Sequence, residues 1–315
     1  MRGKEATLAK AAAEPPAADI RVPVRGGALS DIQPRAQPVW AALTGPYAIF
    51  LLVLLVVPFA NVALFSIHHY SSTHIDLPQL TLENYRKLLT PYYARLFGRT
   101  LEIGLFTTVL CALFGYPLAY SLARAGRRMQ TLGLFLLIMP LMVSTVIRIF
   151  GWLVILGRNG VVNQALAALG LEPIKLLYTE TAVVIGLVNV FMPFMVLPLM
   201  AAIDRIPPSL EEAARNLGAN WYQMFCRTIL PLSLPGLISG CLLVYSISLS
   251  AFVTPALMGS PQGRMVAQQI YDEVLVSFNW PSASSLALAL VLLTAVLVFA
   301  ALLLTRRAGR MERGR

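Results

Sequence analysis

Residues 209–231, SLEEAARNLGANWYQMFCRTILP, combine charged side chains with the residue types that begin and end helices. Ser209 and Glu212 have the spacing of an N-terminal capping box, in which each side chain bonds a backbone amide that the helix leaves unpaired. Gly218 follows two turns later, where glycine adopts the left-handed conformation that ends a helix without steric cost. These signals predict a short helix over 210–217, exposed enough to carry charge.

The predicted helix has one apolar face with the i, i+3, i+4, i+7 spacing, formed by Leu210, Ala213, Ala214 and Leu217. Glu211 and Arg215 are predicted to pair on the opposite face. Asn220 is expected to cap a second helix, which Pro231 closes. Because a two-turn helix is unstable alone in water, this hairpin must pack on its own chain or fit a groove in a soluble partner.

Three histidines in one segment raise the question of a metal site. His68, His69 and His74 lie close together, with Asp76 as the only nearby acidic ligand, and no cysteine stands at a useful spacing. We therefore interpret this cluster as part of a solvated loop. No metal ligand is predicted elsewhere in the chain.

Glu102 and Arg148 are charged residues inside apolar segments, where ionisable groups are functional candidates by default. Glu102 lies near the end of its segment, so it either reaches water along its own stem or contacts a solute. Arg148 lies deeper, in STVIRIFGW, and must face the protein interior or a wet cavity. An ion pair, a helix-end contact and a solute contact all remain open for it.

Hydroxyl and amide side chains occur in other apolar segments. The stretch CLLVYSISLSAFVTP contains Tyr245 and three residues at i, i+4 and i+8, namely Ser246, Ser250 and Thr254. They either make contacts between helices or line a translocation path, and Asn189 and Asn61 have the same two interpretations. Asp272 and Glu273 either face a cationic solute or form a solvated surface.

The segments that position these residues read as membrane spans. The chain has 315 residues, 57% of them hydrophobic and 13% charged, and its mean hydropathy is +0.69; a soluble domain usually carries about 25% charged residues. Apolar runs of the length that crosses a bilayer recur near 46–67, 100–122, 131–153, 181–203, 234–257 and 283–305. The fold class predicted is therefore an all-α membrane protein with six transmembrane helices.

Arginine and lysine predict the orientation. The net charge is +10, but the basic residues lie between the apolar runs rather than along one face, which argues against nucleic-acid binding. The segments 1–45, 123–130, 204–233 and 306–315 carry 6, 3, 3 and 5 basic residues, whereas 68–99, 154–180 and 258–282 carry 4, 2 and 1. The positive-inside rule therefore predicts that both termini and the 204–233 loop are cytoplasmic.

The remaining segments complete the predicted organisation. Residues 1–45 are rich in Ala and Pro and are expected to be a disordered cytoplasmic tail, followed by a six-span domain over 46–305 and a basic cytoplasmic tail over 306–315. Residues 158–171 and 264–280 are predicted to form short amphipathic helices at the outer face.

The hairpin also resembles a known motif. The pattern E-A-A-x-x-x-G followed by L-P is the signature of the membrane subunits of bacterial ATP-binding-cassette importers, and this chain has Glu212, Ala213, Ala214, Gly218, Leu230 and Pro231 at that spacing. Thr228 stands where the family usually has Ile. The resemblance implies a type I importer permease arrangement in which the hairpin is a cytoplasmic coupling helix that docks on an ATPase subunit. It implies that Glu212 is a polar contact to the ATPase, that the alanines form a close-packing surface and that Gly218 forms the turn. Ser209 and Glu211 belong to the same ATPase-coupling segment.

Further stretches are similar to the spermidine/putrescine-type permease branch of that family: GYPLAY, STVIRIFGW, GRNGVVNQAL, GLVNVFMPFMVLPL and SAFVTPALMG. This resemblance implies a second homologous permease, ATP-binding-cassette ATPase subunits and a periplasmic solute-binding protein as partners, in the inner membrane of a bacterium. The chain lacks the G-x-x-x-x-G-K-[ST] phosphate-binding loop, so no cofactor is expected in it, and ATP and Mg are expected on the partner. It is not expected to be an enzyme.

Cargo and mechanism class remain open at this stage. The same branch implies polyamines, opines, aminoethylphosphonate or ferric iron as solutes. A secondary transporter or channel without an ATPase is the alternative, but it would be expected to show titratable pairs or duplicated broken spans. A membrane-embedded enzyme would need a nucleophile–base or metal constellation, and none is found in the sequence.

Overall fold

A computed structural model describes residues 37–70, 77–260 and 263–312. Contacts divide the chain into two units, Met1–Val57 and Pro58–Arg315. Of the tail predicted to be disordered (1–45), residues 1–36 lie outside the described residues. The helices and strands are α2 (Gln37–Ser66), β1 (His68–His69), β2 (Leu77–Leu80), α3 (Glu83–Leu88), α4 (Pro91–Arg124), α5 (Arg127–Met142), α6 (Thr145–Leu156), α7 (Val161–Ala168), α8 (Glu180–Asp204), α9 (Pro208–Asn216), α10 (Trp221–Met224), the π-helix η1 (Phe225–Ile229), α11 (Leu230–Leu249), α12 (Val253–Met258), α13 (Val266–Leu275) and α14 (Trp280–Glu312).

Six helical segments of the described chain are long and apolar enough to cross a membrane: Gly45–Ser66, Pro91–Arg124, Thr145–Ala168, Glu180–Asp204, Trp221–Leu249 and Trp280–Leu303. The prediction of an all-α, six-span membrane protein is therefore confirmed. Two short antiparallel strands, with His68 opposite Leu80, are the only sheet in the described residues. The first helix begins at Gln37, before the predicted boundary, and the last continues to Glu312 through most of the predicted basic tail.

The predicted third span, 131–153, is not one helix. α5 ends at Met142, and Val143 and Ser144 adopt extended backbone before α6 begins. Pro140 lies in the last turn of α5 and has no N–H to continue the hydrogen-bond ladder. The polypeptide therefore changes direction inside a stretch whose hydropathy is continuous.

The predicted fifth span, 234–257, is also displaced. Its helix extends from Trp221 through α10, η1 and α11 and stops at Leu249, and α12 is a separate short helix. A continuous helix would require Pro255 to donate to the carbonyl of Ala251, which proline cannot do. Starting a new helix at Val253 places Pro255 in the first turn, where no donor is needed.

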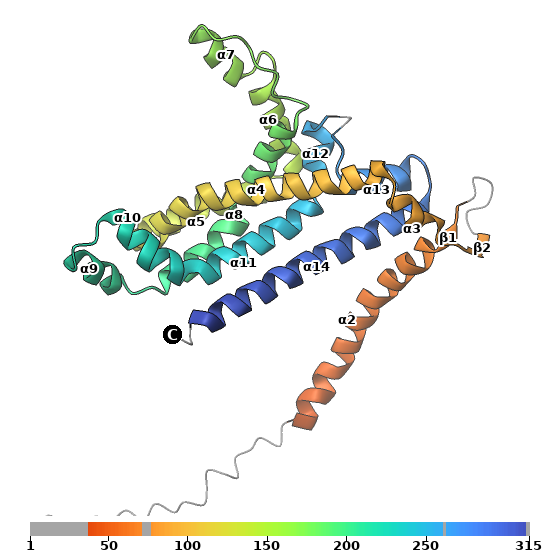
Figure 1. The fold of residues 1–315 in the computed structure, drawn as a ribbon, viewed down its shortest axis with the longest axis horizontal. Helices are drawn as coiled ribbons and strands as arrows, with labels where there is room; N and C mark the ends of the chain where they lie inside the picture. The colour runs from red at the N-terminus through yellow and green to blue at the C-terminus, as the bar shows by residue number, and fades with distance from the viewer. Residues whose placement is uncertain (1–36, 71–76, 261–262, 313–315) are drawn as a thin grey trace, which may run out of the picture. The chain divides into compact units, whose positions relative to one another are not determined.

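The core of the second unit consists of α4, α8 and α11, which pack side by side (Figure 1). Gly236 and Gly240 of α11 face α8 so closely that a Cβ on Gly236 would lie 2.3 Å from Cβ of Ala202, and one on Gly240 would lie 2.8 Å from Sδ of Met195. This small-xxx-small spacing lets the two backbones approach each other. The three helices therefore form a closely packed unit.

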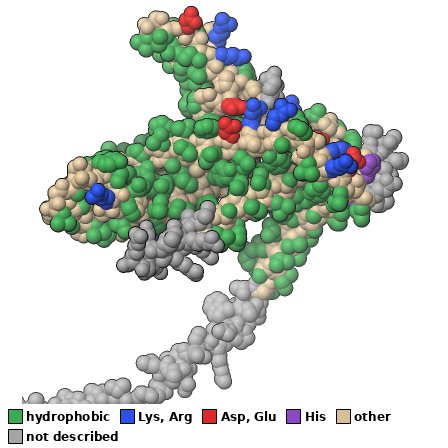
Figure 2. Space-filling view, viewed as in Figure 1, with side chains coloured by type: hydrophobic (Ala, Val, Ile, Leu, Met, Phe, Trp, Pro, Cys, Tyr) green, Lys and Arg blue, Asp and Glu red, His purple; other side chains and the backbone are tan. Residues whose placement is uncertain are grey.

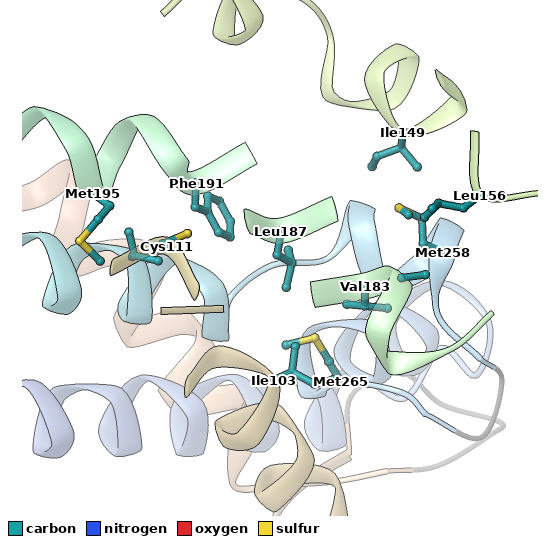
Figure 3. Packing of buried hydrophobic residues seen from close by; sticks show 12 residues of the cluster. Ile103, Cys111, Ile149, Leu156, Val183, Leu187, Phe191, Met195, Met258 and Met265 are labelled. Carbon is teal, nitrogen blue, oxygen red and sulfur yellow. The ribbon is translucent and has the colours of Figure 1, made fainter. Parts of the chain in front are cut away.

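Buried hydrophobic side chains fill this core from several elements. Figure 3 shows Met195 beside Cys111, and Ile103 of α4 beside Met265. Figure 2 shows hydrophobic side chains along the helical bundle, whereas the visible charged side chains gather near its ends and around α6, α7 and α12. In the first unit, the described side chains of α2 from 46 to 57 are all exposed. An exposed apolar surface of this extent suits contact with lipid or another membrane helix.

Candidate functional site

The hairpin of the sequence motif is present, but its first helix starts two residues earlier than predicted. Pro207 is the N-cap and Pro208 the first helical residue, so Ser209 lies inside the helix and makes no capping hydrogen bond. The predicted capping box between Ser209 and Glu212 is therefore wrong. Proline suits this position because its fixed φ fits the helix and its missing N–H would have had no partner.

The turn after α9 is built as predicted. Gly218 has φ +84°, its N–H donates to the carbonyl of Arg215 (2.9 Å), and the N–H of Ala219 donates to the carbonyl of Ala214 (3.1 Å). These two bonds form a Schellman motif, which satisfies the last carbonyls of the helix. Asn220 then caps α10 as predicted. Its Oδ1 accepts from the N–H of Gln223 at 2.8 Å, and Oε1 of Gln223 accepts from the N–H of Asn220 at 3.1 Å.

Glu211 points into the protein rather than toward Arg215, so the predicted pair on α9 is wrong. Its side chain is 9% exposed and its Oε1 lies 2.6 Å from Nε and 2.5 Å from Nη2 of Arg124, at the end of α4. The hydroxyl of Tyr120 donates to the other carboxylate oxygen at 2.9 Å. Arg124 also donates from Nη2 to the carbonyl of Ile206 at 3.1 Å. No local pattern in the sequence predicts this cluster, because Glu211 is 91 positions from Tyr120 and 87 from Arg124.

The apolar face of α9 is divided between the two sides of the helix. Ala214 packs against a buried cluster of Ile206, Met224 and Ile229. The outward side chains are exposed, including Leu210 at 42% and Leu217 at 90%. We call the exposed residues Leu210, Glu212, Ala213 and Leu217 the docking face. An exposed apolar surface on a capped, fixed helix is typical of a surface that binds another protein.

Pro231 does not close the second helix. The N–H of Leu230 donates to the carbonyl of Phe225, five residues back, so the chain makes one π turn before Pro231 and continues as α11. The wider turn accommodates a ring that would clash with a carbonyl four residues earlier. Leu230 packs on the cluster that contains Tyr116.

A second connection joins the hairpin to α4. Trp221 stacks on Phe225 with ring centroids 5.4 Å apart, and Phe225 meets the edge of Tyr116 at 5.0 Å. The hydroxyl of Tyr116 is 2.5 Å from Oγ of Ser233 on α11. The sequence did not predict a role for Tyr116 or Ser233, because nothing distinguishes them from other residues of the apolar segments.

Glu102 is exposed on α4 and lines a cavity of 680 Å³ together with Tyr92, Arg95, Leu96, Gly98, Arg99 and Arg264. Arg99 pairs with Glu180 of α8, Nε to Oε1, at 2.6 Å, and Arg264 pairs with Asp272 of α13. Glu102 therefore stands in an open, strongly charged cavity, which agrees with either of its two predicted roles.

Arg148 has a helix-end role, one of the three interpretations left open by the sequence. Its Nη2 donates to the carbonyls of Pro140 and Val143, the latter at 3.1 Å. These carbonyls lie at the break after α5, and that of Pro140 also accepts from the N–H of Val143 at 3.2 Å. Nε and Nη1 of Arg148 are buried and have no hydrogen-bond partner among the described residues.

The hydroxyl stripe predicted on the fifth span does not exist as one face. Ser250 is the residue after α11 and Thr254 lies in α12, so the i, i+4, i+8 relation with Ser246 is lost. Ser246 and Ser250 donate to carbonyls of their own helix, at 2.7 and 3.1 Å. Thr254 is buried, with Cγ2 2.6 Å from an ideal Cβ on Gly186 of α8, which is a helix contact.

Two further candidates lie in the core. Tyr245 packs with a cluster around Leu249 and Leu286. Asn189 of α8 has a buried Oδ1 without a hydrogen-bond partner among the described residues. A buried amide oxygen needs a donor, so Asn189 is the path candidate with an unused acceptor.

The polar residues of the loops that were predicted to lie outside are tied to their own chain. Lys87 hydrogen-bonds Glu83 at 2.9 Å, and this bond and its charge hold the pKa of Glu83 below its usual range; His69 Nδ1 lies 3.8 Å from Glu83 Oε2. Within the described residues, no three His, Cys, Asp or Glu side chains are placed to hold a metal, and His74 lies outside them. Glu273 accepts from Gln269 at 3.1 Å. The predicted amphipathic helices are present as α7 and α13.

Comparison with known proteins identifies the architecture. The profile of the family described as "Binding-protein-dependent transport system inner membrane component" matches residues 113–310. The chain is 41% identical over 222 residues to the spermidine/putrescine transport system permease protein PotB of Haemophilus influenzae, covering 70% of this chain and 78% of that one. It is 39% identical over 223 residues to PotB of Escherichia coli (strain K12), covering 70% and 81%.

A solved structure supports the fold. The structure titled "Crystal structure of bacterial alginate ABC transporter in complex with alginate pentasaccharide-bound periplasmic protein" matches with a TM-score of 0.65 at 21% sequence identity, over 87% of this chain and 96% of the matched chain. The hairpin, the six apolar helices and the family match agree, and the chain is a multi-pass inner-membrane permease subunit of the binding-protein-dependent, ATP-binding-cassette importer family.

Proposed function

We propose that this chain forms one half of an importer for a polyamine, putrescine or spermidine, which a periplasmic binding protein delivers and a separate ATPase drives. Two relatives at 39–41% identity carry the name of a spermidine/putrescine permease, and this supports the cargo. In this proposal a second homologous permease completes the path, and ATP and Mg bind only to the ATPase. Both termini lie in the cytoplasm, as the distribution of basic residues supports.

The observation that carries the proposal is the construction of the hairpin. α9 is fixed at its end by the Schellman turn at Gly218 and on its inner side by Glu211, while its docking face remains exposed. A surface that is preorganised in this way loses little conformational entropy when a partner binds. The exposed apolar side chains would enter a groove on the ATPase, as a short helix does in a helix-in-groove complex.

Each motif residue has a role in this proposal. Glu212 is the polar contact at the edge of the docking face, and the small side chain of Ala213 permits close approach of the ATPase. Ala214 faces inward and holds α9 on its own domain. Leu230 and Pro231 join the hairpin to α11, so that movement of the hairpin reaches a membrane helix directly.

The translocation path is proposed to alternate between outward and inward openings as the ATPases close and separate. Asn189 is the path candidate with a free acceptor, which fits an ammonium donor, and Glu102 is the exposed carboxylate at the outer cavity. Tyr245 and the hydroxyl residues have structural contacts that account for them, whereas Nε and Nη1 of Arg148, like Oδ1 of Asn189, are buried without a hydrogen-bond partner among the described residues.

The experiment is performed on the complete complex, with both permeases and the ATPase, in lipid nanodiscs. ATP hydrolysis is measured with the binding protein and, in turn, putrescine, spermidine, an opine, aminoethylphosphonate or ferric iron. Stimulation by a polyamine is expected. If another solute stimulates instead, the polyamine cargo is wrong; if no ATPase binds and solute flux persists, the ATP-driven mechanism is wrong.

A charge reversal tests the docking face. Glu212→Lys should lower the affinity of the permease for the ATPase, whereas Glu172→Lys, an exposed reversal in the predicted outer loop, should leave it unchanged. Equal affinities for wild type and Glu212→Lys would remove Glu212 from the docking surface.

A further inference from the structure

The carboxylate of Glu211 is unusual for a nine-residue helix at the edge of a domain. It is 9% exposed, and a carboxylate taken out of water is costly unless it is paired and hydrogen-bonded. An apolar residue at the same place would hold α9 against the domain without that cost. The buried charge therefore needs an explanation other than stability alone.

The bonds to Glu211 fix the direction of α9 as well as its position. Oε1 binds Arg124 and Oε2 binds Tyr120, which is one helical turn earlier on α4. Arg124 also holds the carbonyl of Ile206, in the turn that leads into α9. α9 is thus attached to two successive turns of α4, and a rotation or shift of α9 acts on both.

α4 is the element that can carry such a displacement. Its 34 residues span about 50 Å. Near its other end, Arg99 pairs with Glu180 of α8 at 2.6 Å, and Oγ1 of Thr100 accepts from the N–H of Val266 in α13 at 3.0 Å. One helix therefore connects the hairpin to the elements at the opposite end of the bundle.

The hairpin is joined to α8 and α11 through the chain itself, but to α4 only through side-chain contacts. We propose that Glu211 and Arg124, with Tyr120, form the joint through which movement of α9 reaches α4, so that Glu211 and Arg124 are positioning residues for coupling. The proposal rests on the proposed function, because it needs an ATPase that moves the hairpin. It assigns to Glu211 a task different from that of Glu212, which faces outward.

The test uses neutral variants, which remove a charge and create no repulsion; Glu211→Gln also keeps the shape of the side chain. Glu211→Gln, Arg124→Gln and the double variant are assembled with the second permease, ATPase and binding protein in nanodiscs. Three quantities are measured: affinity for the ATPase, basal ATP hydrolysis, and its stimulation by the binding protein loaded with putrescine or spermidine. Arg127→Gln, an exposed arginine in the same predicted cytoplasmic loop, is the matched control.

We expect each single variant to lower the stimulation about tenfold, within the usual range of coupling between distant sites. Affinity for the ATPase and basal hydrolysis should fall by a smaller factor, because Glu211 also holds α9 in place. The double variant should be no worse than either single one, because both changes break the same joint. Arg124→Lys keeps the charge and should recover most of the stimulation. Arg127→Gln should behave as wild type.

Two results would overturn the inference. Unchanged stimulation in both single variants would mean that the pair transmits nothing. A loss of ATPase affinity by the same factor as the loss of stimulation would mean that the pair only holds the docking surface in shape. Failure of the proposed function is distinguishable, because the wild-type complex itself would then bind no ATPase or show no stimulation.

Discussion

Gly218→Ala is the perturbation whose effect can be worked out most directly from the structure. Gly218 has φ +84°, and a Cβ added there would meet nothing within 4 Å. The substitution therefore causes no clash, and its cost is that of a left-handed conformation for an L-residue, roughly 1–2 kcal/mol. Both bonds of the Schellman turn depend on that conformation.

The consequence for docking follows from the population of the competent hairpin. A change of about 1–2 kcal/mol alters an equilibrium constant by about 5- to 30-fold, and affinity falls with the fraction of protein in the binding-competent state. That factor is the largest loss of ATPase affinity the substitution should produce. Gly218→Asn should cost less, since asparagine tolerates left-handed backbone.

The chain contains its own matched control. Gly170 ends α7 with φ +74°, has open space around it, and makes the same pair of turn bonds, to the carbonyls of Ala167 (3.0 Å) and, through Leu171, of Leu166 (2.9 Å). Gly170→Ala has the same conformational cost at a place remote from the hairpin in sequence. The assay is binding of the ATPase to the permease pair in nanodiscs. Wild-type affinity in Gly218→Ala, or equal losses in both variants, would refute the reasoning.

Four further substitutions test other parts of the structure. Ser209→Ala should change hydrogen-exchange protection of the hairpin by less than about 0.5 kcal/mol, whereas Asn220→Ala should cost about 1 kcal/mol because it removes a real cap. Gly236→Val should lower the thermal stability of the purified permease by about 1–3 kcal/mol or more through overpacking against Ala202; an unchanged melting temperature would contradict the close approach of α11 to α8. Arg148→Gln should destabilise by about 1–3 kcal/mol, through the lost charged bonds to the end of α5, without changing the KM for solute; a changed KM at unchanged stability would return Arg148 to the translocation path.

Features that depend on local sequence were predictable. The number of apolar spans, the turn at Gly218 and the cap at Asn220 follow from composition or from neighbours within four positions, and the structure has all three. The same reasoning failed at Ser209, because both Pro207 and Ser209 are suitable residues to precede the first turn of α9. Pro207 and Pro208 decide between them by placing the first helical residue two positions earlier.

Features that depend on distant contacts were not predictable. Hydropathy is continuous across the breaks near Val143 and Ser250, and Pro140 and Pro255, which lack a backbone donor, lie close to them. The pairing of Glu211 depends on how α9 meets α4, because Arg215 offers an equally plausible local partner. Spacing along the chain predicts which residue is near in sequence. A buried carboxylate instead pairs with the residues that give it the most hydrogen bonds, wherever they lie in the sequence.

The distribution of breaks and close contacts has a mechanical consequence. α4, α8 and α11 are held together by glycine contacts and a buried core, and the hairpin is fastened to this unit at Glu211 and, through Phe225, at Tyr116. The breaks lie elsewhere, between α5 and α6 and between α11 and α12. A force applied at the hairpin would therefore move the closely packed helices together and be absorbed at the breaks, since packed interfaces shift as units rather than deform continuously. This predicts that α6 and α12, rather than the α4–α8–α11 core, change their relation most between the states of the transport cycle.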